Sequence, residues 1–432
     1  MRCAWIAAAV FVALTFPAAA DGLDGRWTGV WVKDGDSLPV TVTFATTPQG
    51  ETGFFDSDDL QVSGIPLAEV KQDGKHTHWV LRGDKSVIEF EGTLKGNRLE
   101  GALTEGAKVG RFALTRQLKT WTAVESADVI FKHDGISLAG TVLRPTGQST
   151  KLLPGIVFTH GSGPEGRWAN RYLATRFAES GFVALITDKR GVGASSGDWK
   201  TANLDDFAAD AEAGIAFLRI QQGVNPARIG VFGHSQGGWV APLVASQDIR
   251  TAFVIASSAG GIGLAETEEY SLANELGVKN RPQAEATEVR AFVHAIVATA
   301  YRGVPYDELK SAVAPFTKRQ WYFDPPPAND YYWSFARKLA AFDPSVTWQK
   351  VRAPVLLLYG GDDERIPVEP SLAAIAAALK AGGHHTPSMK VFAHADHTFR
   401  TGVTGWPKRV SGYADLMVAW ATAHSTSVPA DR

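Results

Sequence analysis

One pentapeptide in the sequence has the residue types that an exposed nucleophilic serine requires. Ser235 stands in Gly233-His234-Ser235-Gln236-Gly237, which has the pattern G-x-S-x-G. An apolar run, Ile229–Gly233, precedes the serine, and a helical pattern, Trp239–Ser246, follows it. The glycines let strand and helix approach closely, because a Cβ at either position would clash at so sharp a turn. The pattern predicts a serine hydroxyl that attacks an acyl carbonyl. A chance Gly-Ser-Gly turn is the alternative, and its flanking strand and helix argue against it.

Two further segments extend this pattern. His160–Pro164 has the sequence His-Gly-Ser-Gly-Pro after an apolar run, and Asp188–Gly193 follows the next run. Together with the pentapeptide they resemble the α/β-hydrolase family, and in particular bacterial hydrolases grouped with dienelactone-hydrolase-like esterases and serine aminopeptidases. The resemblance implies an oxyanion hole made by the backbone N–H groups of Gln236 and Ser162. It implies no metal ion and no organic cofactor. We expect the Gln236 side chain to lie on a helix surface or to shape the pocket.

The same resemblance implies an acid and then a histidine downstream of the serine. The histidine removes the serine proton, and the carboxylate orients the imidazole. An apolar run, Val355–Tyr359, leads into a loop, Gly360–Pro367, that resembles the family pattern G-x-x-D-x-x-V-P. This register selects Asp363 as the acid. Asp362 is the alternative, and we expect Asp362 and Glu364 otherwise to be solvated loop charges.

A histidine suited to the role of base follows the last apolar run, Met389–Phe392. His397-Thr398-Phe399 resembles the family's turn, in which the catalytic histidine precedes a small residue and an aromatic one. His394 is the competing residue, whereas His384 and His385 lie before the run and are expected to be loop residues. The resemblance therefore selects His397 as the general base.

From about residue 127 to residue 432, short apolar runs alternate with helical patterns. The first two runs, Asp128–Lys132 and Ser137–Leu143, predict a hairpin turned at His133-Asp134-Gly135. The later runs are typical of strands buried on both faces of a parallel sheet. They are Gly155–Thr159, Val183–Thr187, Ile229–Gly233, Ala252–Ala256, Val355–Tyr359 and Met389–Phe392. The alternation predicts an α/β domain with a doubly wound, mostly parallel sheet.

An interval of helical and aromatic character, about residues 261–344, interrupts this alternation and predicts a lid over the strand ends. Its aromatic residues either form the lid's own core or pack against a hydrophobic acyl or aromatic group of the substrate. They are Trp321, Tyr322, Phe323, Tyr331, Tyr332, Trp333 and Phe335. The resemblance to serine aminopeptidases implies that Glu266, Glu268 and Glu269 hold a substrate α-amino group. A solvated helix end is the alternative.

Residues 21–118 alternate apolar and polar side chains, with turns about every ten residues. The strand-like runs include Arg26–Lys33, Pro39–Thr46, Thr77–Arg82, Val87–Leu94, Arg98–Thr104 and Arg111–Arg116. They predict a small antiparallel all-β domain, a barrel or a sandwich, and Gly25-Arg26-Trp27 resembles the start of lipocalin-like barrels. We expect a structural or substrate-guiding module, with a ligand-, carbohydrate- or partner-binding module as the alternative. An open cavity lined by aromatic residues would indicate binding, whereas small barrels are often filled with side chains.

Residues 1–20 have the pattern of a secretory signal peptide. Arg2 precedes an uncharged run, Trp5–Phe16, and Ala18-Ala19-Ala20 supplies a small-x-small cleavage pattern. An uncleaved anchor or a buried N-terminal helix is the alternative, although the run is shorter than the about 20 residues that span a bilayer. Cleavage would remove Cys3, the single cysteine. We therefore expect a periplasmic or secreted protein without disulfides and without stable membrane insertion.

Composition narrows the function further. The 432 residues have a formal net charge of -2, with 45% hydrophobic and 20% charged residues, as in globular proteins. The sequence contains no basic stretch interleaved with aromatic residues, so nucleic acid is not an expected partner. We expect a serine hydrolase that cleaves small-molecule carboxylic esters through an acyl-enzyme. The alternatives are an exopeptidase or amidase with the same triad, and a non-catalytic binding protein that kept the fold.

Overall fold

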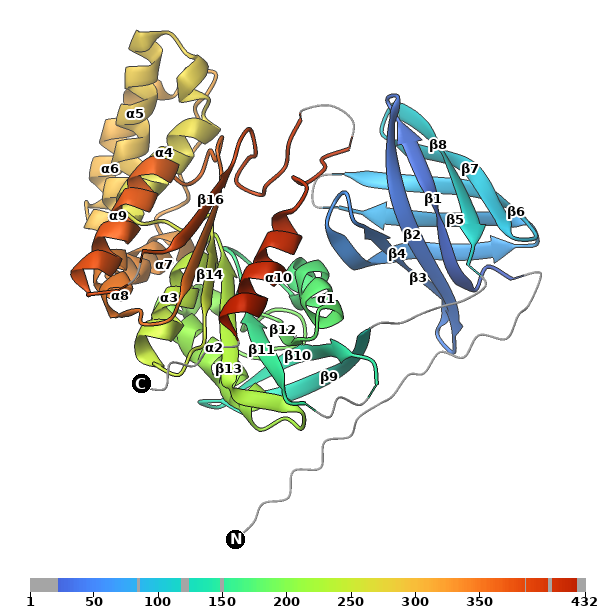
Figure 1. Cartoon of the computed structure of the whole chain (residues 1–432). Helices are drawn as coiled ribbons and strands as arrows, with labels where there is room; N and C mark the ends of the chain where they lie inside the picture. The colour runs from blue at the N-terminus through green and yellow to red at the C-terminus, as the bar shows by residue number, and fades with distance from the viewer. Residues whose placement is uncertain are drawn as a thin grey trace.

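The computed structural model describes residues 22–83, 86–117, 124–147, 151–384, 386–402 and 406–425. The predicted signal peptide, residues 1–20, and His385 lie outside these residues. Two separate sheets organise the described chain: an N-terminal barrel and an open sheet with helices on both faces (Figure 1). This arrangement confirms the predicted fold class, an all-β domain followed by an α/β-hydrolase sheet.

Antiparallel strands close the N-terminal barrel, because β8 pairs with β1 as well as with β7. The strands are β1 (Gly25–Lys33), β2 (Asp36–Thr47), β3 (Gly50–Ser57), β4 (Val62–Asp73), β5 (His76–Arg82), β6 (Val87–Lys95), β7 (Arg98–Glu105) and β8 (Lys108–Arg116). β6 has the expected alternation, with Ile88, Phe90 and Leu94 buried and their neighbours Glu89 and Glu91 exposed. The predicted runs did not include β3 and β4.

Aromatic side chains fill the barrel interior. Trp31, Trp79 and Phe90 are fully buried, and the rings of Trp79 and Phe90 stack with centroids 5.1 Å apart. Trp31 also stacks on Phe55, at 4.6 Å. Because these rings occupy the space that a ligand would need, the packing favours a structural module over a ligand-binding one.

The second sheet has the strand order β16-β15-β14-β13-β11-β12-β10-β9. Its strands are β9 (Val124–His133), β10 (Ile136–Pro145), β11 (Leu153–Phe158), β12 (Val183–Thr187), β13 (Val224–His234), β14 (Val254–Ser257), β15 (Val355–Gly360) and β16 (Ser388–Phe392). β9 and β10 form the predicted hairpin, β10 pairs antiparallel with β12, and the other pairs are parallel. The carboxyl ends of β13, β15 and β16 therefore meet at one edge, and the three predicted catalytic residues follow these ends.

Helices cover both faces of this sheet. One face carries α1 (Arg171–Glu179) and α10 (Tyr413–His424), which share a buried core with the strands. The other face carries α2 (Leu204–Arg219), α3 (Gly237–Gln247), α8 (Pro344–Lys350) and α9 (Val368–Ala381). Among the described helices, none is both long enough and apolar enough to cross a membrane.

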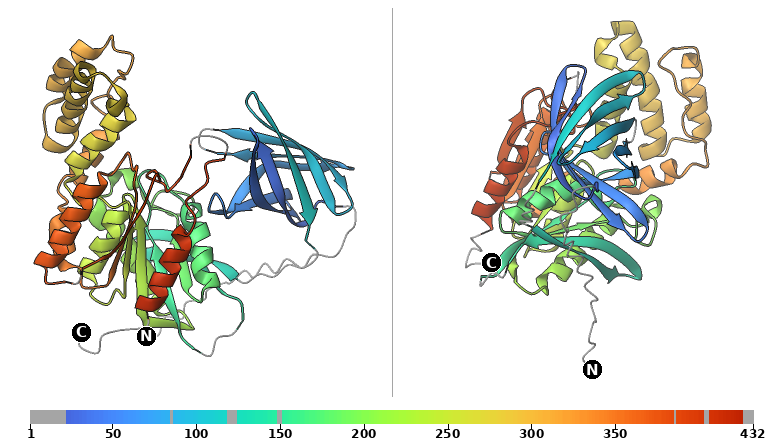
Figure 2. Two further views of the ribbon diagram at one scale, coloured as in Figure 1. Left: turned by 45° about the horizontal axis from the view of Figure 1, so that its top comes forward. Right: turned by 90° about the vertical axis from the view of Figure 1, so that its right-hand side faces the viewer.

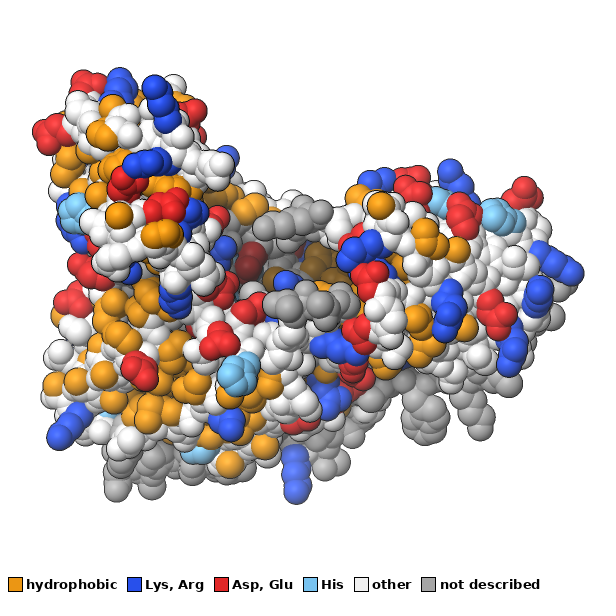
Figure 3. All heavy atoms as spheres, turned by 90° about the horizontal axis from the view of Figure 1, so that it is seen from above, with side chains coloured by type: hydrophobic (Ala, Val, Ile, Leu, Met, Phe, Trp, Pro, Cys, Tyr) orange, Lys and Arg blue, Asp and Glu red, His pale blue; other side chains and the backbone are white. Residues whose placement is uncertain are grey.

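The predicted lid interval contains α4 (Leu264–Glu275), α5 (Gln283–Val297), α6 (Tyr306–Val313) and α7 (Tyr331–Leu339). Trp321 packs on Phe292 in a core that belongs to the lid itself, with ring centroids 5.5 Å apart. Phe335 instead packs on Trp199 below the lid, at 5.7 Å. The lid and the barrel rise on opposite sides of the sheet (Figure 2), and the surface is hollowed between them (Figure 3).

Candidate active site

Ser235 lies on the sharp turn between β13 and α3. Its φ angle is +56°, in the left-handed region that a serine rarely adopts, and its N–H donates to the carbonyl of Ser257 at 3.0 Å. A Cβ added to Gly233 would lie 1.8 Å from the carbonyl oxygen of Gly237. A Cβ added to Gly237 would lie 2.6 Å from Oγ1 of Thr159. Both glycines are thus required by close backbone approach, as the G-x-S-x-G pattern predicted.

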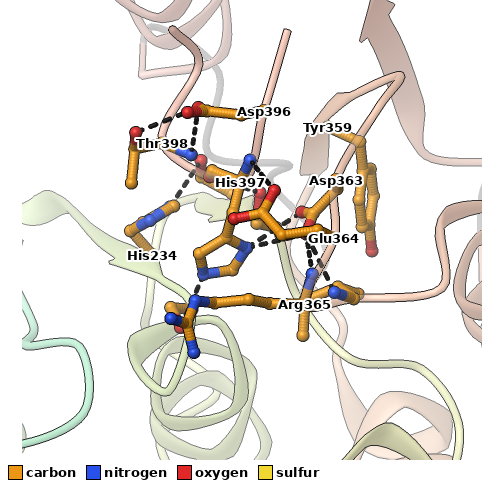
Figure 4. Close-up of polar contacts among 12 residues, drawn as sticks. His234, Tyr359, Asp363, Glu364, Arg365, Asp396, His397 and Thr398 are labelled. Atoms are coloured by element: carbon orange, nitrogen blue, oxygen red, sulfur yellow. Dashed lines mark hydrogen bonds and ion pairs between the residues drawn. The ribbon is translucent and has the colours of Figure 1, made fainter. Parts of the chain in front are cut away.

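A continuous line of polar contacts joins Ser235, His397 and Asp363, and Figure 4 shows how His397 faces Asp363. Nε2 of His397 lies 3.0 Å from Oγ of Ser235, and Nδ1 of His397 lies 3.0 and 2.9 Å from the two carboxylate oxygens of Asp363. Asp363 and His397 are buried, with 1% and 4% of their surfaces exposed. The backbone N–H groups of Arg365 and Ile366 donate to Oδ1 of Asp363, each at 2.8 Å. These two donors fix the position of the carboxylate.

The two competing residues from the sequence lie outside this line. The His394 side chain is 89% exposed, and its Nδ1 lies 3.5 Å from the carboxylate of Asp362. Glu364 behaves differently, because it is partly buried and accepts a hydrogen bond from the backbone N–H of His397 at 3.2 Å. The expectation of a solvated charge is therefore wrong for Glu364 and correct for Asp362.

Helix α4 of the lid holds the loop that carries Asp363. The hydroxyl of Tyr270 donates to the carbonyl of Asp363 at 2.9 Å, and the side-chain amide of Asn274 donates to the carbonyl of Glu364 at 3.0 Å. The sequence did not single out either residue. Their spacing of four places both side chains on one face of α4.

A second histidine packs beside His397. The rings of His234 and His397 have centroids 4.9 Å apart, and Nδ1 of His234 lies 3.2 Å from the hydroxyl of Ser257. That hydroxyl also contacts the hydroxyl of Tyr413 at 2.8 Å. Burial lowers the pKa of His234 well below its usual range, and so does the positive charge that His397 carries when it is protonated. His234 therefore stays neutral beside His397.

The two residues predicted for the oxyanion hole lie in segments that one buried lysine connects. Nζ of Lys189 donates to the carbonyls of Gly161 and Gly163, on either side of Ser162, at 2.8 and 3.1 Å. The same ammonium donates to Oε1 of Gln236 at 2.7 Å. The Gln236 side chain is thus buried against Lys189, and the expectation of a helix-surface position for it is wrong.

Burial shifts the pKa values of Lys189 and Glu165, which both bond to the loop around Ser162. Lys189 has 2% of its surface exposed, and burial lowers its pKa to about 8. The carboxylate of Glu165 accepts a hydrogen bond from the N–H of Gly161 at 2.6 Å, and burial raises the pKa of Glu165. The sequence indicated Lys189 only as part of the segment Asp188–Gly193, since its hydrogen-bond partners lie elsewhere in the sequence.

The residues on either side of Lys189 have a structural role. Asp188 forms an ion pair with Arg167 at 2.8 Å and accepts a hydrogen bond from the backbone N–H of Ala194 at 3.1 Å. Arg190 forms an ion pair with Asp210 at 2.7 Å. Within the described residues, no group of three or more His, Cys, Asp or Glu side chains is suited to hold a metal ion.

Comparison with known families decides where this chain belongs. A family model described as "Serine aminopeptidase, S33" matches residues 153–400, more than half of the chain. The chain belongs to this family. The match includes the serine, the acid and the histidine described above, and it supports a hydrolase of the α/β type.

Curated relatives match this S33-family hydrolase over different lengths. It is 31% identical over 129 residues to the quorum-quenching protein AidA of Acinetobacter baumannii, which is 30% of this chain and 42% of AidA. It is 29% identical over 195 residues to the uncharacterized protein PA2218 of Pseudomonas aeruginosa, covering 45% of this chain and 52% of that one. The chain thus spans about half the length of these two relatives.

A third relative is aligned over most of its length. The bifunctional esterase/perhydrolase DCH of Acinetobacter calcoaceticus is 26% identical over 241 residues, which is 52% of this S33-family chain and 81% of DCH. The crystal structure of PA2218 matches with a TM-score of 0.45 and 19% identity, over 71% of this chain and 96% of that one.

Proposed function

We propose that this S33-family protein is a serine esterase that cleaves carboxylic esters through Ser235, His397 and Asp363. The observation that carries the proposal is the pair of contacts made by His397, to Ser235 Oγ at 3.0 Å and to the Asp363 carboxylate at 2.9 Å. Since Nδ1 donates to Asp363, Nε2 is left as the acceptor for the serine proton. An intact triad also argues against a binding protein that has lost its chemistry.

The reaction proceeds in two steps. His397 takes the proton of Ser235 while Oγ attacks the acyl carbon, and the backbone N–H groups of Gln236 and Ser162 stabilise the oxyanion. His397 then gives its proton to the leaving alcohol, and an acyl-enzyme remains on Ser235. Water, deprotonated by His397, releases the acid and restores the serine.

An exopeptidase with the same triad is the second proposal, and the lid acids speak against it. Glu266 and Glu269 form ion pairs with Arg302 at 3.4 and 2.7 Å, and Glu269 also contacts His294 at 2.9 Å. Their charges are therefore already balanced within the lid. Burial raises the pKa of Glu268, while the charge of Arg365 opposes this shift. Glu268 is thus the one acid of the three left to meet a substrate amine.

Turnover of a substrate panel tests the function. The panel holds p-nitrophenyl esters of increasing acyl length beside aminoacyl-p-nitroanilides, and Ser235→Ala is the control. We expect ester turnover that disappears in Ser235→Ala. If the anilides are instead the better substrates, and if their turnover is lost in Glu268→Gln, the protein is a peptidase rather than an esterase. Turnover of neither class would contradict both proposals.

Export to the periplasm or the medium remains a proposal based on residues 1–20. Expression of the full chain in a bacterium, followed by separation of the periplasm and N-terminal sequencing, tests it. We expect a mature chain that begins at Asp21.

A further inference from the structure

The segment that follows His397 extends away from the active site toward the barrel. Its described parts, residues 400–402 and 406–410, are here called the arm. The N–H of Thr401 donates to the carbonyl of Lys408 at 3.1 Å, and Arg400 and Arg409 form an isolated antiparallel bridge. The two parts of the arm therefore lie side by side. In Figure 2 the segment between β16 and α10 crosses to the near end of the barrel.

The base of the arm is bonded to the turn that carries His397. The N–H of Val410 donates to the carbonyl of Phe399 at 2.8 Å, and the N–H of Asp396 donates to the carbonyl of Arg400 at 2.9 Å. Phe399 has a φ angle of +63°, which a phenylalanine keeps only when its surroundings hold it there. Its ring stacks on Tyr413 with centroids 4.2 Å apart. The backbone at His397 is thus continuous with a turn that depends on external contacts.

The far end of the arm is part of the barrel. Trp406 is buried, with 5% of its surface exposed, and belongs to the barrel's hydrophobic core beside Trp31, at 6.1 Å between ring centroids. The ammonium of Lys33 lies over the Trp406 ring, 4.1 Å from its centre. Trp406 therefore closes one end of the barrel with a residue from near the C-terminus.

Polar contacts fix the same junction. Asp36, the first residue of β2, accepts from the backbone N–H of Trp406 and from Nζ of Lys408, both at 3.1 Å. These two donors lower the pKa of Asp36. Lys408 also donates to the carbonyl of Ser37 at 2.9 Å, and the N–H of Arg409 donates to the carbonyl of Asp59 at 2.8 Å.

From this continuity we propose that the barrel holds His397 in register with Ser235 through the arm. Trp406 and Lys408 are positioning residues, and the barrel is a clamp on the catalytic turn rather than a ligand-binding domain. The inference rests on the proposed function, since it assigns a role in the same triad. The competing account is that Trp406 only completes the barrel core, in which case its loss lowers stability and leaves the triad unchanged.

Two substitutions in one turn give a matched comparison. Asp36→Asn removes the charge that faces Lys408, whereas Asp34→Asn removes a charge that pairs with Lys108 at 2.8 Å and does not touch the arm. Trp406→Ala removes the anchor itself. The readouts are kcat and KM for the ester that the wild type hydrolyses, and the low-field ¹H NMR signal of the Nδ1–H of His397.

We expect Trp406→Ala to lower kcat by about 10- to 100-fold with little change in KM, because a displacement of about 1 Å of a reacting group has such an effect. The His397 signal should broaden by exchange with water. Asp36→Asn should produce the same changes on a smaller scale, about three-fold in kcat, and Asp34→Asn should produce none. Unchanged kcat and an unchanged signal in Trp406→Ala, with a lower melting temperature, would overturn the proposal.

Asp36→Asn decides the question if Trp406→Ala does not fold. The NMR signal needs no substrate, so it separates this inference from the proposed function. The wild type could show no Ser235-dependent turnover while the His397 signal is lost in Asp36→Asn. In that case the proposed clamp is supported and the esterase proposal is wrong. If turnover depends on Ser235 and neither readout differs between Asp36→Asn and Asp34→Asn, the esterase proposal stands and the clamp falls.

Discussion

The barrel and the open sheet bury their side chains in different ways. In the barrel, the inward positions hold rings such as Trp79 and Phe90, and strands such as β6 alternate regularly. At the carboxyl edge of the open sheet, the buried groups are Asp363, His397 and Lys189, and each is held by several hydrogen bonds. The reactive groups thus lie where strands end and the backbone departs from regular geometry. The barrel contributes none of the proposed catalytic residues.

Among substitutions that distinguish the open sheet from the barrel, we expect the largest loss of activity at His397. His397→Ala should lower kcat/KM by about 10⁴-fold or more, since Ser235 would lose its base. His394→Ala is the matched control, because its side chain is exposed and lies outside the triad, and it should change kcat/KM by less than about two-fold. Steady-state kinetics with one ester measure both. A loss of similar size in the two variants would contradict the assignment of the base.

The next effect is expected at the lysine that braces the oxyanion loop. Lys189→Met removes three hydrogen bonds that hold Gly161, Gly163 and Gln236. We expect kcat to fall by about 10- to 100-fold, less than the loss of a complete oxyanion donor, with a smaller change in KM. Lys200→Met, an exposed change nearby, is the control. Equal kinetics for the two variants would show that the loop keeps its shape without the ammonium.

Because Lys189 is buried, we expect a rise in pH to lower activity and to increase stability. Its pKa of about 8 in the folded protein lies below the usual value of 10.5, so the ammonium loses its proton above about pH 8 and kcat should decline. Between pH 8 and 10.5, Lys189 binds a proton in the unfolded chain but not in the folded protein. Raising the pH through this range therefore raises the free energy of unfolding, by up to about 3 kcal/mol. Urea unfolding and kcat, each compared with Lys189→Met from pH 7 to 10, measure the two effects. Parallel pH profiles in the two proteins would contradict the prediction.

The smallest effect on turnover is expected inside the barrel. Trp79→Phe keeps an aromatic ring, and the Trp79 indole N–H has no hydrogen-bond partner among the described residues. The smaller ring should lower the free energy of unfolding by about 1–2 kcal/mol and leave kcat within about two-fold of wild type. Urea denaturation and ester kinetics test this. A fall in kcat as large as that of Trp406→Ala would mean that the whole barrel core, not only the arm, sets the position of His397.

Local patterns in the sequence predicted the elements that carry the chemistry. The elbow at Ser235 depends on Gly233 and Gly237 within five residues, and Asp363 and His397 stand in short segments that resemble motifs of the α/β-hydrolase family. These features are local, so a pattern can indicate them. The catalytic roles of Asp363 and His397 remain predictions, which the mutants above test.

Other features depend on contacts between distant residues, and no local pattern indicates them. Lys189 meets Gln236 only after β12 and β13 pair with β11, and Trp406 meets Asp36 across most of the chain. β4 escaped prediction for a different reason, since its pairing with β3 and β5 contains register shifts that interrupt regular alternation. Glu364 was misjudged because its partner is a backbone N–H on another loop.

The closure of the barrel by Trp406 also orders events during synthesis. The ribosome completes β1–β8 long before residue 406, so a nascent barrel has one end, near Trp31, open to water. That end is covered only when the segment just after His397 arrives. Covering this apolar surface and adding His397 to the chain therefore both await residues 397–406. A chain that ended before residue 397 would therefore leave the apolar barrel end beside Trp31 uncovered and would also lack His397.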